Sequence, residues 1–362
     1  MAKQSLLTDF HRSNGAVFTE RDGWLLPVHF GDVAAEYETV RRAVGLFDLS
    51  HRGLLQFTGP DRLTFLQGML SNDLRPLKTF DGQYATLLSQ QGKVLADLRV
   101  LCALNSLYLD FWENLKDRII EHLNRYLVAD EVEIADRSGE YATLSLQGPN
   151  AETLLRDVTG PADLPSQSAH HAMINLEGAA VCVVRAGHAD EPGFDLIIPN
   201  AAVESIARSL TDSDKQFGIR WVGGEAQNLL RIEAGVPRYG IDFSEENLLL
   251  EVGLDHAVSF TKGCYLGQEV VERIRSRGHV NRKFCGLSLD GQTPAESGDV
   301  IQVDGKEIGR VTSSVVSPRL KRPIALGYLQ RDFWNAGTTV TIKRAGAQIR
   351  AVVTALPFAT SS

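Results

Sequence analysis

The chain has 362 residues, enough for two or three domains with a sizeable buried core. Its content of 43% hydrophobic and 23% charged residues is that of a globular protein, and the net charge of −8 argues against bulk electrostatic binding to nucleic acid or anionic membranes. The N-terminus shows no long apolar region of a secretory signal, and no stretch reaches the length of a membrane helix without polar interruption. We therefore expect a cytoplasmic protein with reduced thiols and no membrane partner.

The first half of the chain repeats one order of structural signals. Residues 55–61 (L-Q-F-T-G-P-D) precede an apolar helical pattern over 63–70, and residues 144–150 (L-S-L-Q-G-P-N) precede another at 154–155. Each unit predicts a strand, a glycine break and a proline in the first helical turn, where its missing N–H costs nothing. The repeat indicates two duplicated α+β lobes, although two ordinary strand-to-helix turns would give the same pattern.

Between these units, residues 94–103 and 107–112 predict a hairpin whose turn lies at Asn105-Ser106. Leucine or isoleucine recurs every four residues from 115 to 127, which predicts an amphipathic helix. Four further apolar runs predict strands at 132–135, 141–146, 181–185 and 194–198.

After about residue 280, short apolar runs alternate with glycine turns, which is typical of a small β-barrel or sandwich. The predicted strands lie at 284–289, 300–303, 308–313, 325–329 and 338–342. We therefore place a domain boundary in the basic segment 273–283 and divide the chain into residues 1–275 and 280–362.

Residues 262–269 (K-G-C-Y-L-G-Q-E) place Cys264 beside Lys262, ahead of a helical pattern at 270–274. A nearby ammonium and a helix N-terminus stabilise a thiolate, so this arrangement suits a reactive cysteine. The alternative is a small buried hydrophobic residue, the usual role of a single cysteine. The four cysteines are widely spaced, unlike the ligands of a zinc or cluster site, and we expect no bound metal.

A dense basic run follows the cysteine loop. It consists of Arg273, Arg275, Arg277, His279, Arg282 and Lys283. The run could hold an anionic ligand tail or contact RNA, or it could be a solvated linker between domains. No aromatic residues are interleaved for base stacking, so we expect no direct RNA binding.

Several segments resemble the glycine-cleavage T-protein aminomethyltransferases, over nearly the whole chain from about residue 15. The loop 185–195 is similar to the family's R-x-G-Y-T-G-E-x-G-[FY]-E element, and 231–235 to its R-L-E-A-G element. Further similar segments are 22–31, 45–51, 71–73 and 146–149. Within this superfamily, residues 262–269 match the K-G-C-[FY]-x-G-Q-E signature of the YgfZ-type folate-binding proteins.

The resemblance implies an α+β fold of duplicated α/β lobes around a central folate pocket, within residues 1–275, followed by a C-terminal β-barrel. It also implies tetrahydrofolate, or a one-carbon derivative, as cofactor. Glu191 lies at the glutamate of the family's G-E pair and is our first candidate for pterin binding. A buried carboxylate can accept two N–H groups of the pterin edge together. The alternative for Glu191 is a solvated loop carboxylate.

The resemblance adds other folate-binding candidates. Tyr84 matches a tyrosine that lines the family's folate site and could pack against the cofactor. Asn72 and Asp73 match a pocket element, although such a pair also forms ordinary turns. Glu251 lies where many relatives have P-L-E, and Arg231 begins the R-I-x-A-G segment.

Aminomethyl-transferring relatives carry two adjacent aspartates in G-G-x-x-D-D-L, and this chain has Ala96-Asp97 there. An acid near the folate would stabilise a developing cation. We therefore expect Asp97 to act in catalysis together with Cys264 and Lys262, the lysine lowering the pKa of the thiol. The missing acid argues against aminomethyl transfer, as does Gln227-Asn228 in place of the family's R-D.

The sequence therefore favours a tetrahydrofolate-binding accessory protein for iron–sulfur cluster assembly or repair, with a thiol-dependent step at Cys264. We expect any effect of this protein on tRNA modification to be indirect. Its expected partners are iron–sulfur assembly factors or cluster-containing client enzymes. The alternative is a folate-dependent aminomethyltransferase or another one-carbon transferase. A third hypothesis, a scaffold protein, predicts no folate binding.

Overall fold

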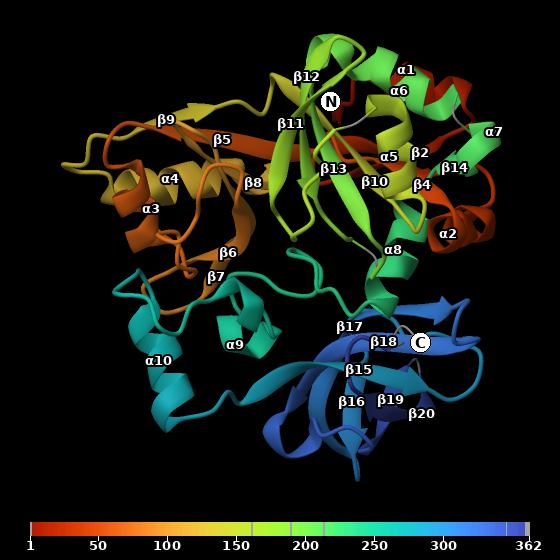
Figure 1. The fold of residues 1–362 in the computed structure, drawn as a ribbon. Coiled ribbons are helices and arrows are strands. Elements are labelled where there is room, and N and C mark those ends of the chain that lie inside the picture. The colour runs from red at the N-terminus through yellow and green to blue at the C-terminus, as the bar shows by residue number, and fades with distance from the viewer. Residues whose placement is uncertain (1, 161, 189, 213, 345, 359–362) are drawn as a thin grey trace. The chain divides into compact units, whose positions relative to one another are not determined.

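The structure is a computed structural model that describes residues 2–160, 162–188, 190–212, 214–344 and 346–358 (Figure 1). The chain forms two compact units from non-contiguous segments. Unit 1 consists of Met1–Leu87, Asp97–Gln227 and Thr261–Tyr265, and unit 2 of Leu88–Ala96, Asn228–Phe260 and Leu266–Ser362. The predicted division into residues 1–275 and 280–362 stays a prediction.

Unit 1 begins with a small sheet in the order β1-β3-β2, from β1 (Lys3–Gln4), β2 (Val17–Arg21) and β3 (Trp24–His29). Helix α1 (Thr8–Ser13) lies between the first two strands in sequence, and helix α2 (Val33–Arg42) follows the sheet. The Asp32 carboxylate accepts hydrogen bonds from the backbone N–H groups of Ala34 and Ala35, which satisfies the first turn of α2.

A five-stranded sheet has the order β6-β7-β8-β5-β9. Its strands are β5 (Arg52–Thr58), β6 (Gly82–Leu88), β7 (Val94–Cys102), β8 (Leu107–Trp112) and β9 (Glu133–Asp136). Its helices are α3 (Arg62–Met69), η1 (Glu113–Leu115) and α4 (Lys116–Tyr126). The predicted hairpin is the antiparallel pair β7–β8, and the predicted amphipathic helix is α4.

A six-stranded sheet has the order β11-β12-β13-β10-β4-β14 and covers a large apolar core. Its strands are β4 (Val44–Asp48), β10 (Tyr141–Gln147), β11 (His171–Leu176), β12 (Ala179–Arg185), β13 (Gly193–Pro199) and β14 (Ile219–Trp221). Its helices are α5 (Ala151–Thr159), η2 (Asn200–Ala202), α6 (Val203–Asp212) and α7 (Asp214–Phe217).

The two large sheets confirm the predicted duplication. The segment β5-α3-β6-β7-β8-α4-β9 and the segment β10-α5-β11-β12-β13-α6-β14 follow the same element order, and their sheets have matching strand orders apart from the inserted β4. Gly59 and Gly148, at the equivalent breaks, have φ of 96° and 130°. A Cβ at either would lie within 2.4 Å of a carbonyl oxygen, so both positions require glycine. Pro60 and Pro149 precede their helices by two residues, rather than lying in the first turn.

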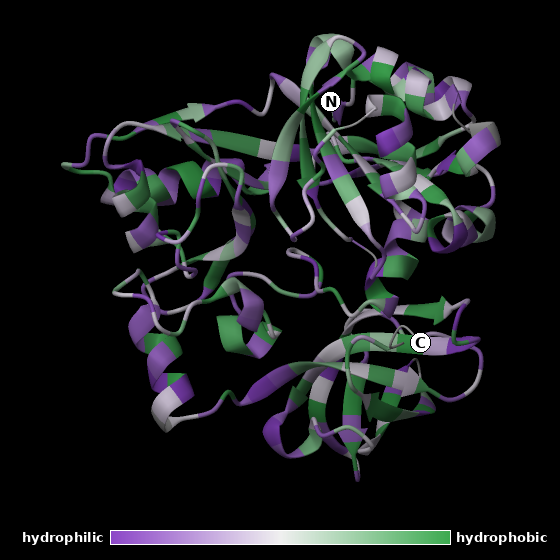
Figure 2. Cartoon of the chain, in the orientation of Figure 1, coloured by the Kyte–Doolittle hydropathy of each residue, from purple (hydrophilic) through white to green (hydrophobic). Residues whose placement is uncertain are grey.

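Unit 2 contains a closed barrel in the strand order β15-β18-β17-β16-β19-β20. Of the two predicted alternatives, the structure therefore has the barrel and not the sandwich. Its strands are β15 (Arg282–Leu289), β16 (Val300–Val303), β17 (Lys306–Ser317), β18 (Arg322–Gln330), β19 (Thr339–Arg344) and β20 (Ala347–Thr354). Apolar and polar residues alternate along several of these strands, as a filled barrel interior requires (Figure 2). The closing strand β20 was not predicted.

The remaining helices of unit 2 are short. They are α9 (Leu249–Val252), η3 (Asp255–Ala257), α10 (Gln268–Arg277) and η4 (Arg331–Phe333). Helix α8 (Gly224–Glu233) spans the boundary between Gln227 and Asn228. No helix within the described part of the chain is long and apolar enough to cross a membrane.

Candidate active site

A tyrosine and an aspartate on neighbouring strands of unit 1 form the centre of the candidate site. Tyr84 on β6 donates its hydroxyl hydrogen to Oδ2 of Asp97 on β7. Asp97 is buried, with 8% of its surface exposed. Burial and the adjacent carboxylate raise the pKa of Tyr84 well above its ordinary value. At neutral pH the phenol therefore stays protonated and donates to the carboxylate.

Ala96 and Asp97 point to opposite faces of β7, because side chains alternate along a strand. Asp97 lies on the face that meets Tyr84, whereas Ala96 is fully buried. A carboxylate at position 96 would enter that buried face. The retained aspartate, Asp97, is thus the acid that contacts Tyr84. The alanine at position 96 takes no carboxylate away from the Tyr84 face of the strand.

The turn after α3 supports the strand that carries Tyr84. Asn72 donates a hydrogen bond from Nδ2 to the backbone oxygen of Tyr84 at 2.9 Å. The neighbouring Asp73 accepts three hydrogen bonds from Arg75, two of them from the guanidinium, and these bonds, with one from Gln67, lower its pKa to about 2. The structure therefore brings Asn72 to Tyr84 and pairs Asp73 with an exposed arginine.

The ammonium of Lys262 is held by the same turn. Its Nζ donates to the backbone oxygens of Gln67, Leu70 and Asn72 at 2.7, 2.7 and 2.8 Å, which matches its three hydrogens to three carbonyls. The side chain is buried, and burial lowers its pKa to about 8. These contacts give Lys262 a structural role in the turn, and its predicted effect on the Cys264 thiol stays a prediction. Cys264 is exposed, and its predicted catalytic role stays a prediction.

A buried ion network lies beside the Tyr84–Asp97 pair. Arg52 and Arg99 both donate through Nε to Asp110, at 2.6 and 2.8 Å. Arg99 also reaches Asp195 on β13, with Nη1 2.6 Å from Oδ2. Because Arg99 follows Asp97 by two residues on β7, both side chains project from the same face. The network thus joins the two large sheets at the candidate site.

His188 extends this network to the surface of unit 1. Its Nε2 lies 2.9 and 3.0 Å from the two carboxylate oxygens of Asp195. The histidine side chain is 27% exposed and that of Asp195 is fully buried. Burial alone would raise the pKa of Asp195, but His188, Arg99 and Arg52 lower it below its ordinary value. Asp195 is therefore a buried, ionised carboxylate that orients a partly exposed imidazole.

The sequence did not predict this network as a site. Its members are Arg52, Arg99, Asp110, Asp195 and His188. Two signals were available. Charged residues interrupt the apolar runs 94–103 and 107–112, and position 188 has histidine where the family element has tyrosine. Neither signal reveals that residues of different strands meet.

Glu191 lies outside this network and is partly exposed. Its Oε1 accepts a hydrogen bond from Nη1 of Arg41 on α2 at 3.0 Å, and its side chain is 20% exposed. A carboxylate offers about four acceptor positions, so this ion pair leaves capacity for a ligand's N–H groups. The predicted pterin-binding role of Glu191 stays a prediction.

Arg231 and Glu251 belong to unit 2 and make contacts there. Arg231 is buried and donates to Asp242 at 2.6 Å and to Ser313 at 2.9 Å. Glu251 accepts from the backbone N–H of Leu248 and from Arg282, both at 3.2 Å. These contacts join the 228–260 segment to the barrel strands, and the predicted folate-binding roles of the two residues stay predictions.

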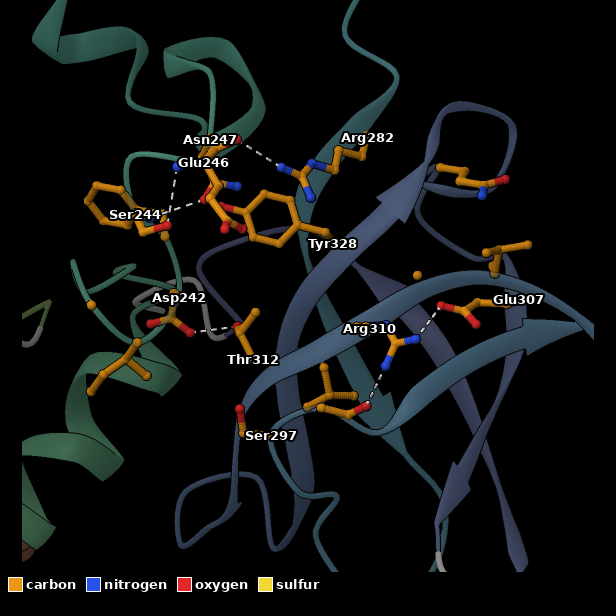
Figure 3. A pocket seen from close by; sticks show the side chains of 18 residues that line it. Asp242, Ser244, Glu246, Asn247, Arg282, Ser297, Glu307, Arg310, Thr312 and Tyr328 are labelled. Atoms are coloured by element: carbon orange, nitrogen blue, oxygen red, sulfur yellow. Dashed lines mark hydrogen bonds and ion pairs between the residues drawn. The ribbon is translucent and has the colours of Figure 1, made fainter. Parts of the chain in front are cut away.

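Unit 2 also contains a cavity of about 500 Å³ between residues 240–247 and strands β15, β17 and β18 (Figure 3). Arg282 lies over the ring of Tyr328, 5.3 Å from its centroid, and Arg310 pairs with Glu307 at 2.9 Å. Both cations are thus engaged within the cavity wall, and we assign no ligand to it. Across the described residues, no group of three or more His, Cys, Asp or Glu side chains could hold a metal ion.

Comparison with known proteins gives matches over almost the whole chain. Residues 7–262 match the GCVT N-terminal domain, and residues 282–359 match the glycine cleavage T-protein C-terminal barrel domain. An aminomethyltransferase of Chlorobium phaeovibrioides is 32% identical, covering 98% of both chains, and one of a Geobacillus species is 32% identical, covering 99% of both. The crystal structure of glycine cleavage system aminomethyltransferase T from Bartonella henselae has a TM-score of 0.91 at 26% identity, covering 99% of this chain and 98% of that one.

These similarities correct the function predicted from the sequence. An accessory role in iron–sulfur cluster assembly or repair is wrong. The relatives that match over their full length are named aminomethyltransferases, and so is the similar solved structure. They favour the alternative that the sequence analysis ranked second.

Proposed function

Because the chain belongs to the glycine-cleavage T-protein family, we propose that it is a folate-dependent aminomethyltransferase. In the proposed reaction, an aminomethyl group on the thiol of a lipoyl carrier gives its carbon to tetrahydrofolate and releases ammonia. The observation that supports this function best is the buried Asp97 carboxylate, kept on the Tyr84 face of β7 although the neighbouring acid is absent.

The polar groups of unit 1 suit tetrahydrofolate. The pterin edge carries N–H donors, and unit 1 offers two carboxylate acceptors: Asp97 beside Tyr84, and Glu191 beside Arg41. When bound, the folate supplies the nitrogen nucleophiles that take up the one-carbon unit. Asp97 would stabilise the positive charge that develops on the transferred group, because a buried carboxylate acts through a low local dielectric.

A turnover assay tests this function directly. Purified protein, tetrahydrofolate and an aminomethyl-lipoyl carrier protein should form methylene-tetrahydrofolate and ammonia. Asp97→Asn keeps the size of the side chain and removes its charge, and we expect a loss of roughly 10²–10³-fold in kcat, the range for one electrostatic group. Exposed Asp9→Asn is the matched control and should keep the wild-type rate. No turnover by the wild type would contradict the proposal.

The partner that follows from this function is the protein carrying the lipoyl group. The finer resemblance of residues 262–269 to YgfZ-type proteins stays a prediction within the T-protein family. It would place the chain in a branch whose cysteine loop differs from that of the aminomethyltransferases. The same turnover assay with the variant Cys264→Ser tests whether the thiol contributes to the rate.

A further inference from the structure

We propose that His188, oriented by Asp195, transfers the proton that the departing amine requires in the aminomethyl-transfer reaction. This inference rests on the proposed function. Its basis is a histidine–aspartate pair in which the aspartate is fully buried and the imidazole is 27% exposed. A buried carboxylate that fixes one ring nitrogen leaves the other available for proton transfer.

The two ring nitrogens of His188 have different surroundings. Nε2 faces both oxygens of Asp195, so its hydrogen is shared with an ionised carboxylate. Within the described residues, Nδ1 has no hydrogen-bond partner. The neutral ring therefore carries its hydrogen on Nε2 and presents the lone pair of Nδ1, which can take up and return a proton.

Hydrogen bonds from neighbouring elements hold His188 in position after β12. The backbone N–H of His188 donates to Oε1 of the buried Gln147 at 3.0 Å. Gln147 in turn donates from Nε2 to Ser145 and to the backbone oxygen of Ala186, both at 2.8 Å. A Cβ at Gly193 would lie 2.3 Å from that amide nitrogen, so the close packing there requires glycine. A proton-transfer residue needs such a fixed position.

The charged groups that Asp195 links to His188 form a balanced set of two cations and two anions. These are Arg52 on β5 and Arg99 on β7, with Asp110 on β8 and Asp195 on β13. The facing side chain of β10, Gln147, is neutral.

The proposed proton transfer balances. The donor's C–N bond breaks with its electron pair on nitrogen, and protonated His188 gives that nitrogen one hydrogen, so that ammonia leaves. His188 recovers a proton from an N–H of the acceptor when that nitrogen bonds to the carbon. The acceptor's second N–H proton goes to the sulfur as the C–S bond breaks and the carrier becomes a thiol. No oxidant or reductant is needed.

The test compares His188→Gln with His170→Gln. Glutamine keeps a donor toward Asp195 but does not titrate, and His170 is a matched control because it is 28% exposed and lies 3.4 Å from Asp81. We expect His188→Gln to lose roughly 10²-fold or more in kcat, the range for acid–base catalysis, and to lose one limb of the kcat pH profile. Its Kd for tetrahydrofolate, measured by calorimetry, should stay within about two-fold of wild type. His170→Gln should match the wild type throughout.

Nitrogen-15 NMR of the wild-type protein gives a readout independent of turnover. It should show His188 protonated at Nε2, with Nδ1 titrating. Wild-type kcat and pH profile in His188→Gln, or a ring protonated at Nδ1 alone, would overturn the role of His188 and leave the transferase function intact. Absence of turnover in the wild type would overturn the transferase function and this role with it. If His188→Gln does not fold, His188→Asn replaces it in the same comparison.

Discussion

The hydroxyl of Tyr84 and the carboxylate of Asp97 share a hydrogen bond between strands β6 and β7. The bond ties the predicted catalytic aspartate to the edge strand of its sheet. It also keeps the phenol neutral, because a phenolate beside this buried carboxylate would be strongly disfavoured.

Tyr84→Phe should weaken the candidate site without disrupting the sheet. The substitution removes one donor from a buried carboxylate, which costs about 1–3 kcal/mol in the free energy of unfolding. We expect a lower kcat as well, because Asp97 loses the group that fixes its position. Denaturant unfolding and the transferase assay measure the two effects. Tyr126→Phe, on helix α4, is the control, and equal losses in both variants would show that the bond to Asp97 is unimportant.

Lys262→Met should destabilise unit 1. The ammonium satisfies three backbone carbonyls at the end of α3 and the turn that follows, and methionine keeps the apolar stem but has no donor. Leaving buried acceptors without partners costs about 1–3 kcal/mol. Denaturant midpoints of the variant and of the exposed-site control Lys78→Met measure this cost. If Lys262→Met unfolds at the wild-type midpoint, the structural role of the ammonium is wrong.

Lys262 and Ala96 show which structural features can be inferred from the sequence and which cannot. The alternation of apolar residues is local, and it predicted the hairpin β7–β8, helix α4 and most barrel strands. The partners of Lys262 lie up to 195 positions earlier in the chain, so its neighbour Cys264 suggested a role that its contacts do not support. Similarly, the adjacency of Ala96 and Asp97 hid the fact that the two side chains face opposite sides of the strand.

The Asp195 network was beyond prediction for the same reason. Arg99 and Asp195 come from different sheets, and their contact depends on how the duplicated lobes pack within unit 1. Residue types alone would suggest two solvated surface charges. Only the fold shows that both are buried, and burial is what makes the pair able to orient His188.

Asp48→Asn should remove part of the acid sensitivity of the fold. Burial raises the pKa of Asp48, but the hydrogen bond and charge of His11 and the bonds from Ser5 and Ser50 outweigh it and lower the pKa to about 2 from 3.8. A carboxylate with a depressed pKa in the folded state stabilises the protein above its unfolded pKa. That contribution is lost as the pH falls from about 4 to about 2.

The difference in pKa corresponds to about 2 kcal/mol. We therefore expect the unfolding free energy of the wild type to fall more steeply between pH 4 and pH 2 than that of Asp48→Asn. The variant should also be less stable at neutral pH, since the buried His11 loses its charged partner. Parallel curves for the two proteins would show that Asp48 does not contribute to acid unfolding.

His171→Phe should remove a destabilising effect that appears in mild acid. Burial, together with the charge of His170, lowers the pKa of His171 to about 4 from 6.5. The unfolded chain then binds more protons than the folded one between pH 6.5 and pH 4, so stability falls as the pH decreases through this window. The loss amounts to as much as about 3 kcal/mol below pH 4.

Phenylalanine has a similar shape, does not titrate and can keep the edge contact with the Phe80 ring, whose centroid lies 5.6 Å away. Unfolding free energies from pH 7 to pH 4 should therefore decline less in His171→Phe than in the wild type. The neighbouring His170→Phe should change the slope by a smaller amount, because it removes only the charge that adds to the effect of burial on His171. A wild-type slope in His171→Phe would mean that the acid sensitivity in this window comes from other groups.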